Sequence, residues 1–137
     1  MMKTRKQGMK TTSAAVAALL AGMLAATASA AAQAEIIDIA WDAGGRFERT
    51  LSVAPGKFAE VCGKLERGLP VAWTFSAERP LNFNIHYHAG KQVVFAARQD
   101  GVAAAQGELA VEVDQDYCWM WSNKSAAAVQ LRLTLAR

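Results

Sequence analysis

Residues 81–88 read LNFNIHYH, a strict alternation of apolar and polar side chains. Successive side chains of a β-strand point to opposite faces, so this period of two predicts a strand with one buried and one exposed face. The apolar row is Leu81, Phe83, Ile85 and Tyr87, and the polar row is Asn82, Asn84, His86 and His88. Because both histidines of the chain lie in the polar row, this strand is the first place to look for a ligand site.

The same period of two continues through most of the chain. The expected strands cover residues 37–41, 47–53, 71–76, 81–88, 93–95, 109–113, 117–121 and 129–135, while residues 58–65 fit either a strand or a short helix. A turn is expected at residues 78–80 and a loop around residues 99–101, while residues 102–105 fit either a loop or a poorly packed strand edge. The pattern predicts an all-β fold, an antiparallel β-sandwich or jelly roll of about eight short strands.

Residues 117–121, which read YCWMW, carry the largest aromatic side chains of the chain. Tyr117, Trp119 and Trp121 share one face of the expected strand, and Cys118 and Met120 share the other. Exposed tryptophans would suggest a platform that stacks on sugar rings. Large aromatics dominate sandwich cores, so we favour a central core strand.

The first 30 residues have the features of a secretory signal peptide. Lys3, Arg5, Lys6 and Lys10 precede a short apolar run over residues 14–26, and small residues follow it. Cleavage is expected after Ala30, or as late as Ala34. The apolar run is shorter than the roughly 20 residues that span a bilayer, and no later stretch qualifies. We therefore expect one domain over residues 35–137, exported by a Sec-type signal to the periplasm or outside the cell, with no membrane span.

Removal of this segment changes the charge of the chain. Four of the 15 basic residues and none of the 12 acidic ones precede residue 35, which leaves 11 basic and 12 acidic residues. Phosphate binding needs a clustered positive patch. The remaining bases are scattered, so we expect no nucleic-acid partner.

The domain has two cysteines, Cys62 and Cys118. In an oxidising compartment a disulfide between them is the default expectation. The alternative is that a free thiolate serves as a metal ligand, but thiolates outside the cytosol tend to be oxidised.

His86 and His88 are spaced so that both imidazoles project from one strand face. Neutral imidazole is a common ligand of zinc and copper, so this pair is a candidate metal site. A closed site needs three or four donors, and the sequence has no third histidine. Further donors in the sequence are Met120, which would suit Cu(I), and the carboxylate of Asp114 or Asp116. The amides of Asn82 and Asn84 are poor donors. The competing interpretation is a polar strand face that bonds only to its neighbours and to water.

No catalytic constellation is present in the sequence. Serines and aspartates occur, but without the spacing of a nucleophile elbow or of a metalloprotease. We expect a non-catalytic protein.

Residues 65–75 and 83–86, together with the run DYCWMWSN at 116–123, resemble the Golgi-dynamics (GOLD) domain. The resemblance covers about residues 46–135. It implies a β-sandwich, a disulfide that joins Cys62 to Cys118, and a role in binding rather than catalysis. It supplies no site residues, and the coiled coil and membrane helix of the family's cargo receptors have no counterpart here.

The sequence thus predicts an exported, non-catalytic β-sandwich that binds an unidentified protein or small ligand. The alternative function is a periplasmic copper or zinc protein that uses the face of His86 and His88. The sequence does not determine an oligomeric state.

Overall fold

A computed structural model describes residues 34–137, so the expected signal peptide lies outside the described residues. Seven strands and no helix occupy the described range: β1 (Glu35–Asp38), β2 (Arg46–Val53), β3 (Phe58–Leu65), β4 (Pro70–Ala89), β5 (Gln92–Ala110), β6 (Gln115–Ser122) and β7 (Val129–Ala136). Residues 34–137 accordingly hold no helix that could cross a membrane. The all-β prediction is confirmed, and the segment 58–65 is a strand.

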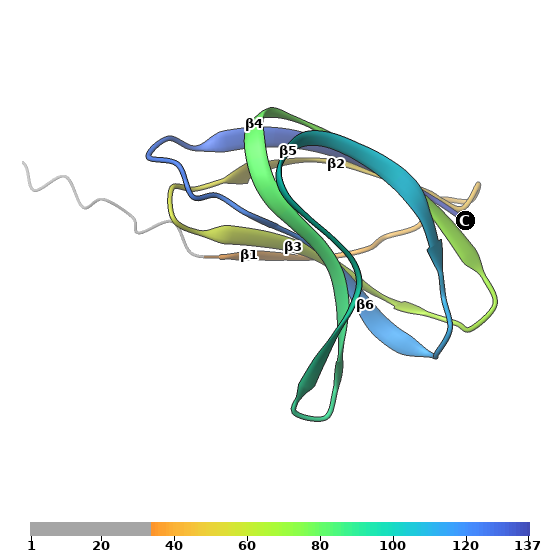
Figure 1. Cartoon of the computed structure of the whole chain (residues 1–137). Coiled ribbons are helices and arrows are strands. Elements are labelled where there is room, and N and C mark those ends of the chain that lie inside the picture. The colour runs from red at the N-terminus through yellow and green to blue at the C-terminus, as the bar shows by residue number, and fades with distance from the viewer. Residues whose placement is uncertain (1–33) are drawn as a thin grey trace, which may run out of the picture. The chain divides into compact units, whose positions relative to one another are not determined.

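The strands form one continuous sheet that bends at β4 into two facing halves (Figure 1). The first half of β4 pairs with β7, which pairs in turn with β2. The second half of β4 pairs with β6, and β3 and β1 follow outward. Strand β5 pairs with β4 on its other side along both halves. All these pairings are antiparallel except that of β1 with β3, which is parallel.

The prediction of a turn at residues 78–80 is wrong, because β4 continues through Pro80 as a single strand of 20 residues. The pairing partner changes here: β7 pairs as far as Ala77, and β6 begins at Asn82. The register with β5 also shifts between Ser76 and Leu81. A proline removes a backbone N–H from the ladder. Pro80 is tolerated because it lies where no partner strand is in register.

The predicted loop around residues 99–101 is also wrong, and of the two alternatives for residues 102–105 the strand holds, because both segments lie within β5. Gly101 has a positive φ of 67° and forms a bulge opposite Asn82. The side-chain oxygen of Asn82 accepts a hydrogen bond from the Gly101 backbone N–H at 3.0 Å. The alternation of β5 is broken by this bulge and is therefore weak in the sequence.

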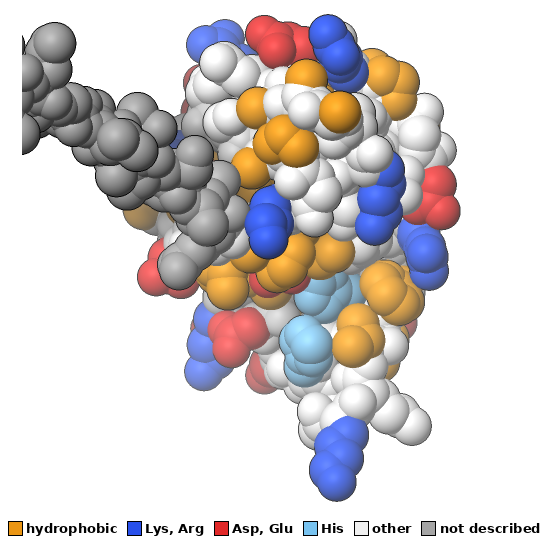
Figure 2. All heavy atoms as spheres, turned by 90° about the vertical axis from the view of Figure 1, so that its left-hand side faces the viewer, with side chains coloured by type: hydrophobic (Ala, Val, Ile, Leu, Met, Phe, Trp, Pro, Cys, Tyr) orange, Lys and Arg blue, Asp and Glu red, His pale blue; other side chains and the backbone are white. Residues whose placement is uncertain are grey.

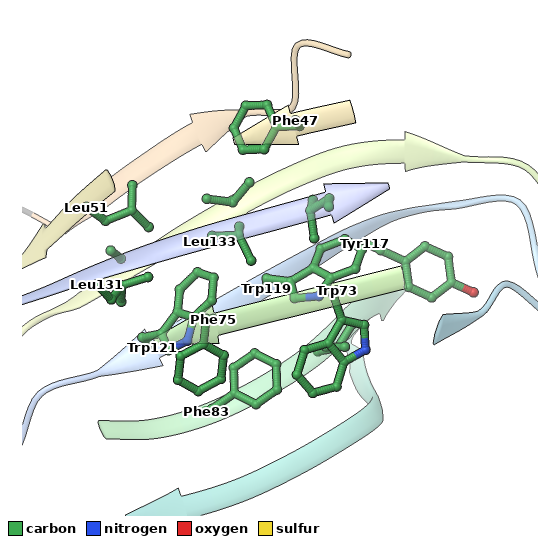
Figure 3. Packing of buried hydrophobic residues seen from close by; sticks show 14 of the residues in the cluster. Phe47, Leu51, Trp73, Phe75, Phe83, Tyr117, Trp119, Trp121, Leu131 and Leu133 are labelled. Carbon is green, nitrogen blue, oxygen red and sulfur yellow. The ribbon is translucent and has the colours of Figure 1, made fainter. Parts of the chain in front are cut away.

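Aromatic side chains from β4 and β6 meet in the core between the two halves (Figure 3). The ring centroid of Phe83 lies 4.8 Å from that of Phe75, 5.0 Å from that of Trp73 and 5.6 Å from that of Trp121. Trp119 and Trp121 are fully buried, as the core interpretation of residues 117–121 predicts. Phe75 and Phe83 belong to the two halves of the same strand, so their contact joins the halves across the core.

The Cys62–Cys118 disulfide joins β3 to β6, which confirms the expected pairing. The two cysteines are direct partners in the ladder. Their neighbours Val61 and Trp119 belong to the core, so the disulfide lies on the opposite, outer face of the sheet, where Cys118 is still largely covered. The bond closes a loop with a sequence separation of 56. In the chain-entropy account, closing a loop of this length restricts the unfolded chain.

Asn123 follows β6 and ties the loop before β7 to the end of β2. It is fully buried, and its amide N–H₂ donates to the carbonyls of Val53 at 2.9 Å and of Ala127 at 2.7 Å. Its amide oxygen accepts from the backbone N–H and the hydroxyl of Ser125. All the hydrogen-bonding capacity of the side chain is used inside the protein.

Replacement of both cysteines by alanine should lower the free energy of unfolding by about 4 kcal/mol, since the unfolded chain regains the entropy of the closed loop. Chemical denaturation of the variant and of the wild type measures the difference. Wild-type protein treated with a reductant serves as a second comparison and should shift in the same direction. An unchanged midpoint in both would contradict the prediction.

Asn123→Ala should destabilise the protein by about 2–4 kcal/mol, because the buried carbonyl of Val53 and the part-buried carbonyl of Ala127 lose their donor. Asn123→Asp keeps the size of the side chain but cannot donate to either carbonyl, so it should cost a similar amount. Thermal or denaturant unfolding gives both values. Ser125→Ala is the matched control and should cost less, since it removes only a part-buried hydroxyl. Equal losses for all three variants would argue against this role of the amide.

Candidate functional site

The outer face of the half-sheet β1–β3–β6–β4–β5 carries the predicted site residues. Cα partners in adjacent strands share a face, so the ladder defines rows across it. One row contains Cys62, Cys118, His86 and Phe95, and the next contains Glu60, Met120, Asn84 and Arg98. Except for the two cysteines, the residues of these rows line a groove of about 400 Å³, together with His88. Figure 2 shows the two histidines next to each other on the surface, with hydrophobic side chains beside them.

His86 is the buried centre of this face, with 4% of its surface exposed. Its Nδ1 lies 2.7 Å from the side-chain oxygen of Asn84. An amide oxygen can only accept, so Nδ1 carries the proton and Nε2 of the neutral ring has a free lone pair. Asn84 therefore fixes the tautomer of His86.

Glu60 of β3 faces this lone pair, with its Oε1 at 3.7 Å from His86 Nε2. That distance is too long for a hydrogen bond. Burial raises the pKa of the Glu60 carboxyl, and the charge of His88 opposes this rise. Burial also lowers the pKa of His86, and the charge of His88 lowers it further. Desolvation thus favours the neutral forms of both groups.

His88 stands beside His86 and closer to solvent. The two ring centroids are 5.3 Å apart with a T-shaped arrangement. His88 is exposed, whereas His86 is buried. The His88 side chain is therefore freer to change its conformation, although the two histidines share a strand face. The prediction that both imidazoles project on one side is consistent with this geometry.

The sulfurs of the disulfide lie at the edge of the same cluster. Cys118 Sγ, a His86 nitrogen and a Glu60 oxygen all lie within 4.8 Å of one another. Cys62 Sγ lies 3.9 Å from Glu60 Oε2 but has no proton to donate, since it is bonded to Cys118. The cysteines therefore shape the site as a disulfide and offer no thiolate.

Among the other predicted donors, three are already engaged in hydrogen bonds within the protein. Met120 lines the groove, directly across from Asn84 in the ladder. Asn84 positions His86, and Asn82 bonds to the bulge at Gly101, so neither amide is left over as a ligand. Asp114, which the sequence offers as a further carboxylate, instead accepts a hydrogen bond from the backbone N–H of Arg67.

Glu60 and Phe95 are the residues of this face that sequence reasoning missed. The position of Glu60 could have been inferred from the sequence, because pairing Cys62 with Cys118 in antiparallel strands places Glu60 opposite Met120. Phe95 was not, because its position depends on a bulge at Ala96, between the pairs Ile85–Ala97 and His86–Phe95. The bulge turns Phe95 and Val93 to the side of the histidines.

The tautomer of His86 is testable by NMR. Replacement of Asn84 by alanine removes the acceptor, so the neutral His86 ring should gain the form protonated on Nε2, seen in the ¹⁵N shifts of the imidazole. Asn82→Ala is the matched control and should leave those shifts unchanged. A wild-type ring already protonated on Nε2 would contradict the assignment.

No family model matches this chain, and comparison with curated proteins finds no match. Solved structures do match. PliG from Aeromonas hydrophila, a periplasmic inhibitor of g-type lysozyme, is 16% identical with a TM-score of 0.57, over 76% of this chain and 96% of that one. The pre-peptidase C-terminal domain of a Bacillus anthracis collagenase is 11% identical with a TM-score of 0.54, over 75% and 94%. PliG from Salmonella Typhimurium is 7% identical with a TM-score of 0.51, over 76% and 98%. At these identities the likeness concerns the fold, and the GOLD resemblance stays a prediction.

Proposed function

We propose that this chain is an exported, non-catalytic module that binds another protein and inhibits it. The signal-like first 30 residues support export. The fold supports the role, since it is shared with inhibitors from Aeromonas hydrophila and Salmonella Typhimurium that are described as periplasmic and directed at g-type lysozyme. A g-type lysozyme is therefore the first partner to test.

The observation that carries this proposal is an exposed apolar pair on the β4–β5 hairpin. This hairpin projects from the body of the domain (Figure 1). Phe95 is 49% exposed and Val93 43% exposed, and both border the groove of the histidines. Arg98 lies over the Phe95 ring, with its guanidinium carbon 5.4 Å from the ring centroid. Exposed apolar side chains with a polar rim are typical of protein–protein contacts, and aromatic residues and arginine dominate their binding energy.

The form of the groove favours a protein over a small molecule. Small-ligand sites usually enclose most of the ligand's surface. Here the groove lies on the outer face of a sheet, with the histidines and their apolar neighbours visible from outside (Figure 2). A protein surface that lies across the hairpin could cover Phe95 and Val93 together, whereas a small molecule would stay largely in solvent.

The test measures lysis of a peptidoglycan suspension by a g-type lysozyme, with and without the purified protein. The wild type should slow lysis and form a complex visible by calorimetry. Phe95→Ser should weaken that complex at least about tenfold, because a central aromatic contact is lost. Leu69→Ser is the matched control: Leu69 is 46% exposed and lies outside the groove, so its loss should change little.

Two outcomes would contradict the proposal. If the wild type neither slows lysis nor forms a complex, the lysozyme partner is wrong. If Phe95→Ser and Leu69→Ser bind as tightly as the wild type, the hairpin is not the contact surface.

A further inference from the structure

Glu60 and His86 present two donor atoms to the same small space. The Nδ1 proton of His86 is bonded to Asn84, so the lone pair of Nε2 faces Glu60 Oε1 at 3.7 Å. No proton bridges a gap of this length. A buried lone pair thus faces an oxygen of a half-buried carboxyl group, and a cation between the two atoms would stabilise this arrangement.

The separation of the two atoms fits one shared metal ion. Zinc binds histidine nitrogen and carboxylate oxygen at roughly 2.0–2.2 Å, so two such donors in a tetrahedral site lie about 3.4 Å apart. The observed 3.7 Å is within a few tenths of an ångström of that value. A small rotation of the Glu60 side chain would bring both atoms into range.

His88 can supply a third donor. It projects from the same strand face as His86, with ring centroids 5.3 Å apart, and its exposure leaves the ring free to turn. His88 also lines the same groove as Glu60 and His86. Two imidazoles and one carboxylate form a donor set that metal sites in proteins use, with the remaining positions left to water.

The hydrogen bond from His86 to Asn84 is also what a metal ligand requires. A ligating histidine usually donates its second ring N–H to an oxygen acceptor, which fixes the tautomer and orients the ring. Asn84 supplies that acceptor at 2.7 Å. The cysteine sulfurs next to the cluster are bonded to each other, so the donors are nitrogen and oxygen, which suit Zn(II) and Cu(II).

We propose that Glu60, His86 and His88 form a binding site for one divalent transition-metal ion, Zn(II) or Cu(II), at the base of the groove. The site uses the two histidines that the sequence singles out and adds the carboxylate that the sequence leaves unassigned. The site lies in the groove that borders the proposed protein contact but does not need the partner, so metal titration of the protein alone tests it separately from lysozyme inhibition.

The test titrates Zn(II) and Cu(II) into purified, disulfide-bonded protein freed of metal by a chelator. The wild type should bind one ion per chain. Glu60→Gln and His88→Ala should each raise the dissociation constant at least about tenfold, since even outer-shell partners of metal sites have effects of that size. Glu108→Gln, which removes an exposed carboxylate on β5, is the matched control and should bind like the wild type.

Electron paramagnetic resonance of the Cu(II) form gives a second readout. The wild type should show coupling to two imidazole nitrogens, and His88→Ala should show coupling to one. His88 is exposed, so this variant should fold, and near-ultraviolet circular dichroism checks that it does. Equal affinities for the wild type, Glu60→Gln and His88→Ala would overturn the proposal, as would an unchanged copper spectrum in His88→Ala.

Discussion

The shared strand β4 is the constraint on which the rest of this domain depends. Its first half belongs to one side of the sandwich and its second half to the other, so one backbone forms part of both walls of the core. The contact between Phe75 and Phe83, at 4.8 Å, closes the bend from within. Because β5 follows β4 along both halves, the hairpin that carries the candidate site is an extension of the same element that organises the core.

The pairing of the strands decides which side chains lie next to one another on the outer face of the domain. Trp119 and Trp121 face the core. Cys118 and Met120 alternate with them along the strand and must therefore face outward. The disulfide fixes the register of β3 against β6, and the pairing of Cys118 with His86 continues that row into β4. A buried histidine and a carboxylate therefore meet because of core packing and one covalent bond, rather than through a loop built around a ligand.

Period-two patterning predicted the fold class and the buried aromatic face, because both depend on local alternation. The disulfide was predicted from the two cysteines and the expected oxidising compartment. The patterning of single strands was not sufficient everywhere. It failed where β4 and β5 continue through Pro80 and Gly101. Those residues normally end strands. Pro80 is acceptable because the pairing partner of β4 changes at the bend, and Gly101 is acceptable because it forms a bulge in β5. Such a change is a property of the whole sheet. No window of sequence along one strand contains it.

The candidate site shows the same limit at the scale of single residues. His86 and His88 were predictable because the alternation of one strand places them. Glu60 required the pairing of two strands, which the cysteines could have supplied. Phe95 required a bulge at Ala96, and bulges depend on backbone irregularity that side-chain patterns do not encode. Glu60, which faces the His86 ring, and Phe95, which forms the apolar border, are thus brought to this face only when the whole sheet is assembled.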